Sequence, residues 1–156
     1  MTIQLYRVSA RPIILTPDQR IVLVTSSRGD AWVLPGGGID RGETLPQAAR
    51  REAQEECGVE IVVERAIWLR EYYHRQYDEV NLETYFLARP VSDAPLPDRW
   101  EHLDADDPGL TRTVGLYSRA ELRSIAMPVY PAELREALWV GLEKGFEVVY
   151  LGRVAG

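Results

Sequence analysis

GGIDRGETLPQAARREAQEECGV, residues 37–59, carries the strongest local structural signal in this 156-residue chain. Thr44 followed by Gln47 is typical of a capping box, in which each side chain bonds the other residue's backbone N–H. Gly58 is the left-handed residue expected just past the end of a helix. Together these signals predict a helix over residues 45–57.

Three acids share one face of that predicted helix. At 100° per residue, Glu52, Glu55 and Glu56 fall within an arc of about 100°. Like charges at this spacing repel each other, and Arg51, four residues before Glu55, offsets only part of the repulsion. A hard divalent cation, Mg²⁺ or Mn²⁺, would satisfy such oxygen ligands. For the three glutamates alone, a solvated acidic face is the simpler explanation.

The glycines and a further acid, Glu43, favour a metal site over a solvated acidic face. Their spacing resembles the complete Nudix box of the MutT-like hydrolases, and every fixed position matches: Gly37, Glu43, Arg51, Glu52, Glu55, Glu56, Gly58 and Val59. The segment WVLPGGG at residues 32–38 extends the resemblance. The resemblance implies an α+β fold, the Nudix α/β/α sandwich with a mixed β-sheet.

The resemblance also implies a reaction: hydrolysis of a nucleoside diphosphate linked to a group X, by attack of water on phosphorus. Such a reaction depends on positioning and on neutralising phosphate charge. Mg²⁺ or Mn²⁺ would be the cofactor. Its implied ligands are Glu52, Glu55 and Glu56, with a backbone carbonyl near Gly37 and a more distant Glu43.

Two catalytic roles follow from the same resemblance. Glu52 is the favoured general base, and Arg51 would orient a glutamate of the box. The alternative base is an acid in the 101–107 segment, which holds Glu101, Asp104, Asp106 and Asp107. Substrate contacts are predicted at Arg28 and Arg70, which would bind phosphates, and at Trp32 and Tyr77, which would stack on a base.

The predicted substrate is a small-molecule nucleotide, either a (deoxy)nucleoside triphosphate or a dinucleoside polyphosphate. A nucleotide sensor without turnover is the alternative. Sensors of this fold usually lose box carboxylates, whereas this chain keeps all four, so the sequence favours an enzyme.

Composition sets broad limits. The length predicts a single domain, residues 1–156. A net charge of −6 argues against a nucleic-acid backbone as partner. Cys57 is the only cysteine, so no internal disulfide can form. The sequence shows neither a signal peptide at MTIQLYRVSAR nor a membrane-length apolar run, so we expect a cytoplasmic protein that does not bind membranes. Homodimers are common in the family, and a homodimer stays possible here.

The remaining pattern predicts the other elements. We expect one or two strands in residues 3–15, broken near Pro12, and a strand at 21–25 that would pair with them as a hairpin. Further strands are expected at 32–34, 60–69 continuing through 71–77, 81–88, 114–117 and 146–151. Ser118 should cap a short helix, and residues 131–144 should form a longer one. Residues 90–110, with four prolines, should form one long loop.

Overall fold

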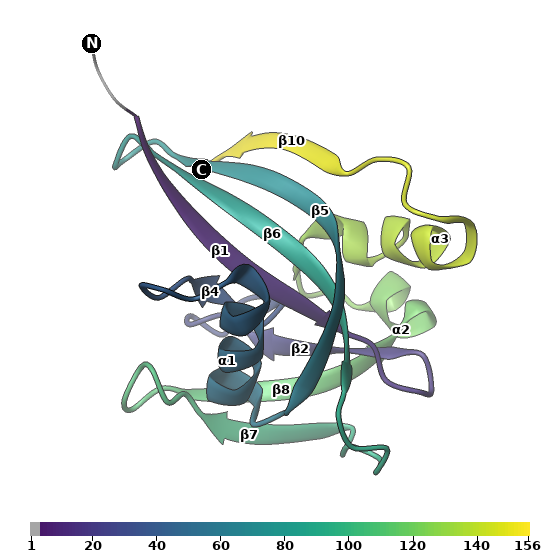
Figure 1. Ribbon diagram of the computed structural model, residues 1–156. Coiled ribbons are helices and arrows are strands. Elements are labelled where there is room, and N and C mark those ends of the chain that lie inside the picture. Colours follow the sequence, from purple (N-terminus) through teal and green to yellow (C-terminus); the bar gives the residue numbers. More distant parts are fainter. Residues whose placement is uncertain (1–3) are drawn as a thin grey trace.

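The computed structural model describes residues 4–156 and contains two mixed five-stranded sheets (Figure 1). Ile3, included in the first predicted strand, lies outside the described residues. The first sheet has the order β10-β5-β6-β1-β4, formed by Tyr150–Ala155, Ile61–His74, Glu79–Pro90, Leu5–Ile14 and Gly37–Gly38. The second has the order β7-β8-β2-β3-β9, formed by Arg99–Leu103, Thr111–Ser118, Arg20–Thr25, Trp32–Val33 and Val129–Tyr130.

Helix α1 spans Leu45–Cys57, as its capping signals predict. The Thr44 hydroxyl accepts from the Gln47 amide, and the Gln47 side chain accepts from the Thr44 amide. Gly58 has a φ of 70° and ends the helix. The buried face is lined by alanines, Ala48, Ala49 and Ala53, which allow α1 to lie close to the strands below it.

Strand β1 separates two layers of packing because its successive side chains point to opposite faces. Ala10 packs on the face that carries α1, in a cluster with Phe86. Ile13 packs in the larger core cluster with Leu122 and Leu138, which come from α2 (Arg119–Ser124) and α3 (Ala137–Lys144). Figure 1 shows α2 and α3 together, away from α1. The α/β/α sandwich implied by the resemblance is confirmed.

The predicted hairpin between the first two strands is wrong. Strand β1 pairs with β6 in parallel and with β4, whereas β2 pairs with β8 and β3. Only an isolated bridge joins Leu15 to Ile21. Strand β1 runs unbroken through Pro12 and pairs with β6 over ten residues, whereas β2 pairs with β8 over five. The turn between β1 and β2 therefore carries the chain from one sheet to the other.

The predicted long loop at 90–110 is also wrong in part, because it contains β7. In this edge strand Trp100 and His102 are half-buried, while Arg99, Glu101 and Leu103 are exposed. Since only two side chains face inward, the hydrophobic signal is too weak to stand out against the flanking prolines and acids.

The C-terminal part differs from the prediction in two places. Residues 131–144 form a 3₁₀ turn, Ala132–Leu134, followed by α3, because the backbone leaves helical geometry at Glu136, where φ is −140°. The terminal strand lies further along than 146–151, at Tyr150–Ala155, where it pairs in parallel with β5. The short helix capped by Ser118 is confirmed as α2. Within residues 4–156, no helix is long and apolar enough to cross a membrane.

Candidate active site

A glycine turn lies directly against the acidic face of α1. Gly36 has a φ of 145°, and a Cβ atom there would lie 2.5 Å from the carbonyl oxygen of Ala10, so only glycine fits. The Gly36 amide donates to Oε2 of Glu56 at 3.3 Å. The turn therefore approaches the carboxylates of α1 with its backbone.

Two of those carboxylates are buried. Glu52 is 5% exposed and Glu56 is 7% exposed. Burial raises the pKa of Glu56 to about 7, with Arg112 opposing and Glu52 reinforcing the shift. Burial also raises the pKa of Glu52, although the charge of Arg51 works against it. Both acids are held where their negative charge is poorly solvated.

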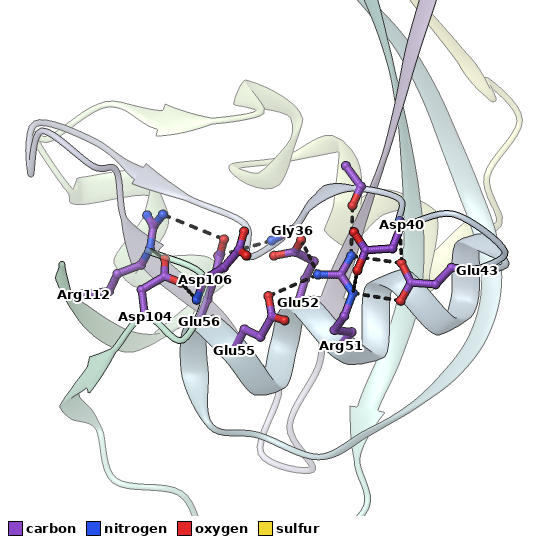
Figure 2. A network of polar contacts seen from close by, with 11 residues as sticks. Gly36, Asp40, Glu43, Arg51, Glu52, Glu55, Glu56, Asp104, Asp106 and Arg112 are labelled. Atoms are coloured by element: carbon purple, nitrogen blue, oxygen red, sulfur yellow. Dashed lines mark hydrogen bonds and ion pairs between the residues drawn. The ribbon is translucent and has the colours of Figure 1, made fainter. Parts of the chain in front are cut away.

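Arg51 forms hydrogen bonds with three of the acids, Glu43, Glu52 and Glu55 (Figure 2). Its Nε donates to Oε2 of Glu43 at 2.8 Å, and its Nη1 donates to Oε1 of Glu52 at 3.0 Å and to Oε2 of Glu55 at 3.1 Å. Its Nη2 donates to the carbonyl oxygen of Gly38 at 3.0 Å. The hydrogen bonds from Arg51 lower the pKa of Glu43. Arg51 therefore joins the helix N-terminus, the glycine turn and the acidic face.

The loop between β7 and β8 brings a further acid to this centre (Figure 2). Asp104 is only 4% exposed, and its Oδ2 accepts from Nε of Arg112 at 2.8 Å. Its Oδ1 accepts from the Asp106 amide at 3.0 Å, and the Ala105 amide donates to the Glu55 carbonyl oxygen at 3.2 Å. The charge of Asp106 contributes to the raised pKa of Glu52. Asp106 is thus an acid of the 101–107 segment that lies near α1. Its carboxylate, unlike that of Asp104, does not accept a hydrogen bond from Arg112.

Arg112 is a site residue that sequence reasoning missed. Its Nη1 donates to the Thr25 carbonyl oxygen at 2.9 Å, and its Nη2 lies 3.9 Å from Oε1 of Glu56. Strand β7 also contacts the end of α1: Nε1 of Trp100 donates to the Cys57 carbonyl oxygen at 2.9 Å. No local sequence signal marked Arg112, because its partners lie on β2, on α1 and in the loop before β8.

The acidic residues suit a divalent cation by chemistry, although they are not gathered as a preformed cage. Among residues 4–156, no three His, Cys, Asp or Glu side chains come together as a metal-binding group. Arg51 draws Glu43 and Glu55 toward itself. Glu52 and Glu56, by contrast, are buried oxygen ligands with raised pKa values, and an added cation would compensate that unfavourable charge.

A pocket of about 530 Å³ opens beside the glycine turn, between the two sheets. Its walls come from six strands, β1, β3, β5, β6, β9 and β10, and its lining residues include Arg11, Arg70, Tyr72, Glu83 and Tyr130. Arg70, predicted to contact substrate, is thus on the pocket wall. Nη2 of Arg70 donates to Oε2 of Glu133 at 2.6 Å.

The other predicted substrate contacts lie elsewhere. Trp32 is 4% exposed, with its ring 5.0 Å from that of Tyr117. Tyr77 is 67% exposed at the turn between β5 and β6, and Arg28 is exposed after β2. None of the three lines the pocket beside the turn. Three tyrosines do line the pocket, Tyr72, Tyr85 and Tyr130. Tyr72 was one of several aromatics that the sequence offered for base stacking, whereas nothing in the sequence pointed to Tyr85 or Tyr130.

The α/β/α sandwich, with a glycine turn against the acidic face of α1, matches the class of protein that the sequence resembles. The NUDIX domain family model matches residues 5–145, and the chain belongs to this family of hydrolases. The RNA pyrophosphohydrolase of Legionella pneumophila is 29% identical over 126 residues, which cover 66% of this chain and 72% of that protein.

Solved structures share the fold. A NUDIX hydrolase from Nitrosomonas europaea superposes with a TM-score of 0.68 at 18% identity, covering 99% of this chain and 82% of its own. A MutT NUDIX hydrolase from Burkholderia pseudomallei superposes with a TM-score of 0.58 at 25% identity, covering 88% of this chain and 96% of its own. The Nudix assignment made from residues 37–59 is confirmed.

Proposed function

We propose that this protein hydrolyses a pyrophosphate bond in a nucleotide, with Mg²⁺ or Mn²⁺ as cofactor. One observation carries the proposal: Glu52 and Glu56 are buried against the Gly36–Gly37 turn, with raised pKa values and a loop carboxylate, Asp106, beside them. A site whose carboxylates are buried and poorly solvated is suited to bind a cation, and the cation in turn attracts phosphates.

The ligands we propose for the metal are Glu52, Glu55 and Glu56, with Gly37 contributing its carbonyl and Glu43 at a greater distance. A bound divalent ion would neutralise phosphate charge and make water a stronger nucleophile. Glu52 would accept the proton of the attacking water as general base. Asp106 is the loop alternative for that role, since Asp104 is engaged by Arg112.

The residues around these acids hold them in place. Arg51 orients Glu52 and Glu55 through two hydrogen bonds from one Nη1. Gly36 fixes Glu56 through its amide. The pocket would hold the nucleoside part of the substrate, with Arg70 on its wall. Arg28, Trp32 and Tyr77 stay predictions as substrate contacts, and their positions outside the pocket would require substrate to reach another surface.

The substrates we propose first are nucleoside triphosphates and dinucleoside polyphosphates. The triphosphorylated 5′ end of RNA is a second candidate, because the Legionella pneumophila relative is named RNA pyrophosphohydrolase. We predicted from the net charge of −6 that nucleic acid is not a partner, and the name of this relative does not support that prediction. A short triphosphorylated RNA compared with the free triphosphate of its first nucleotide separates the two candidates.

The test is release of phosphate and pyrophosphate from a panel of nucleotides with Mg²⁺, with Mn²⁺ and with chelator. We expect turnover that needs the metal and that Glu55→Gln and Glu56→Gln abolish. Wild-type turnover by either variant would refute the metal assignment. Binding of Mn²⁺ followed by electron paramagnetic resonance gives a readout that does not depend on activity.

Tight nucleotide binding without turnover of any compound would favour the sensor alternative. Three further expectations stay predictions: a single domain, a cytoplasmic location and a possible homodimer. Limited proteolysis, cell fractionation and sedimentation test them in turn.

A further inference from the structure

A row of alternating charges crosses the sheet side of the pocket. Arg11 on β1 and Arg70 on β5 flank Glu83 on β6, and all three line the pocket. Nε of Arg11 donates to Oε1 of Glu83 at 3.0 Å, and Glu83 lies directly opposite Arg70 in the β5–β6 register. Glu133 extends the row beyond Arg70. The signs therefore run plus, minus, plus, minus.

The central carboxylate of this row is held on both oxygens. Oε1 of Glu83 accepts from Arg11, and Oε2 accepts from the hydroxyl of Tyr85 at 2.6 Å. Nη1 of Arg11 donates to the Leu34 carbonyl oxygen at 3.3 Å, which ties the guanidinium to the segment before the glycine turn. Each carboxylate oxygen keeps a second acceptor site, and the guanidinium keeps further N–H groups. The pair thus presents donors and acceptors in fixed positions.

The charge balance decides what kind of group this wall can bind. Each arginine is already paired with a glutamate, so a phosphate placed here would meet Glu83 as well as Arg11. An uncharged group whose edge carries both donors and acceptors complements the wall without leaving a charge unpaired. Tyr72 and Tyr130 line the same pocket, and aromatic side chains are suited to contact with a flat ring. A nucleobase has both properties.

We propose that the Arg11–Glu83 pair is the specificity determinant of this pocket and reads the hydrogen-bonding edge of a nucleobase. This inference rests on the proposed function and deepens it: compounds that carry a pyrophosphate but no base are poor substrates. A site built to pair with polar groups discriminates against analogues that lack them, because the remaining hydrogen-bonding positions of Arg11 and Glu83 then lose a partner when the substrate displaces water.

The experiment compares kcat/KM for the four ribonucleoside triphosphates with that for ribose 5-triphosphate, which has the phosphates and sugar but no base. For the wild-type protein we expect the best nucleotide to exceed ribose 5-triphosphate by about 100-fold or more. Glu83→Gln replaces one acceptor by a donor at nearly constant volume. We expect it to lower kcat/KM for that nucleotide about 10- to 100-fold, through KM, and to lower kcat/KM for ribose 5-triphosphate much less, so that the preference for a base falls.

The chain supplies a matched control on the same two strands. Arg7 and Glu79 form the same kind of pair four residues earlier, with Nε of Arg7 3.1 Å from Oε2 of Glu79. The Arg7 side chain is 76% exposed, and neither residue lines the pocket. Glu79→Gln should keep the wild-type preference. Arg11→Lys keeps the charge but loses the planar fork, and should reduce the preference as Glu83→Gln does.

Equal kcat/KM for ribose 5-triphosphate and the nucleotides in the wild-type protein would overturn this inference while leaving the proposed hydrolase intact. An unchanged preference in a folded Glu83→Gln protein would overturn it too. Absence of all turnover in the wild-type protein would instead refute the proposed function. In that case, calorimetry with nucleoside triphosphates and ribose 5-triphosphate decides: base-dependent binding that Glu83→Gln weakens supports the inference, and base-independent binding or none refutes it.

Discussion

Gly37 lies directly against the Glu52 carboxylate: a Cβ atom on Gly37 would come within 2.7 Å of Glu52 Oε1. The carboxylate has little room to give way, because Glu52 is buried and its Oε1 accepts from Arg51. The absence of a side chain at residue 37 thus sets the position of a proposed metal ligand and base.

Gly37→Ala should therefore displace the Glu52 carboxylate while leaving α1 intact. We expect kcat to fall about 10- to 100-fold, since small misplacements of a catalytic group are costly, with a loss of folding stability of about 1 kcal/mol. Steady-state kinetics and thermal unfolding measure the two effects. Gly38→Ala is the matched control, because nothing lies within 4 Å of a Cβ atom there. Equal kinetics for the two variants would contradict the proposed role of this contact.

Glu52→Gln should lower kcat by about 100-fold or more, the usual contribution of a general base. Asp106→Asn should lower kcat by only about 10-fold if its carboxylate supports the site without accepting the proton of the attacking water. Asp107→Asn, an exposed neighbour in the same loop, should have no effect. Single-turnover kinetics of the three variants separate these cases. A larger loss for Asp106→Asn than for Glu52→Gln would transfer the role of base to the loop.

The stability of the metal-free protein should fall as the pH rises from 5 to 7.5. Burial raises the pKa of Glu56 from 4.5 to about 7 in the folded protein, so the folded state binds this proton more tightly than the unfolded state. The resulting stabilisation is complete below about pH 4.5 and is lost as the pH passes about 7, amounting to about 3 kcal/mol. Glu52, whose pKa is also raised, acts in the same direction.

Urea unfolding in chelating buffer at several pH values measures this effect. Glu56→Gln should remove most of the slope, because glutamine does not titrate. A constant difference in unfolding free energy between the wild-type protein and Glu56→Gln across this pH range would show that Glu56 titrates normally.

Arg112→Met should destabilise the fold by about 3 kcal/mol or more, because it leaves the buried Asp104 and Glu56 carboxylates without their cation. Chemical unfolding measures the loss. Arg89→Met is the comparison: its pair with Glu64 is exposed at both ends, and we expect less than about 1 kcal/mol. Similar losses for the two variants would mean that the Arg112 pairs contribute no more than surface ion pairs.

The helix of residues 45–57 could be predicted to the residue because its determinants are local. Thr44, Gln47 and Gly58 bond to backbone groups within a few positions along the chain, so the sequence contains the whole interaction. The family and the sandwich fold followed from the glycine and acid spacing around this helix. Substrate contacts such as Trp32 stayed untested predictions, because residue type alone does not show which side chains line a pocket.

The rest depended on long-range pairing. Strand β7 is held by its neighbour β8 and by the Trp100 contact with the end of α1, neither of which shows in its own composition. The pairing of Arg11 with Glu83 joins residues 72 positions apart. Arg112 gave no sequence signal for the same reason, since its partners come from β2, α1 and the preceding loop.

The acids of this site come from one short continuous segment with a single added loop, whereas the pocket wall is assembled from six separate strands. Substitutions on those strands can therefore alter the preferred nucleoside in small independent steps, while the segment of residues 37–59 is inherited unchanged. Such an arrangement makes the pocket a practical target for directed evolution: a library confined to β1, β5 and β6 positions would vary selectivity while every member kept the same reaction.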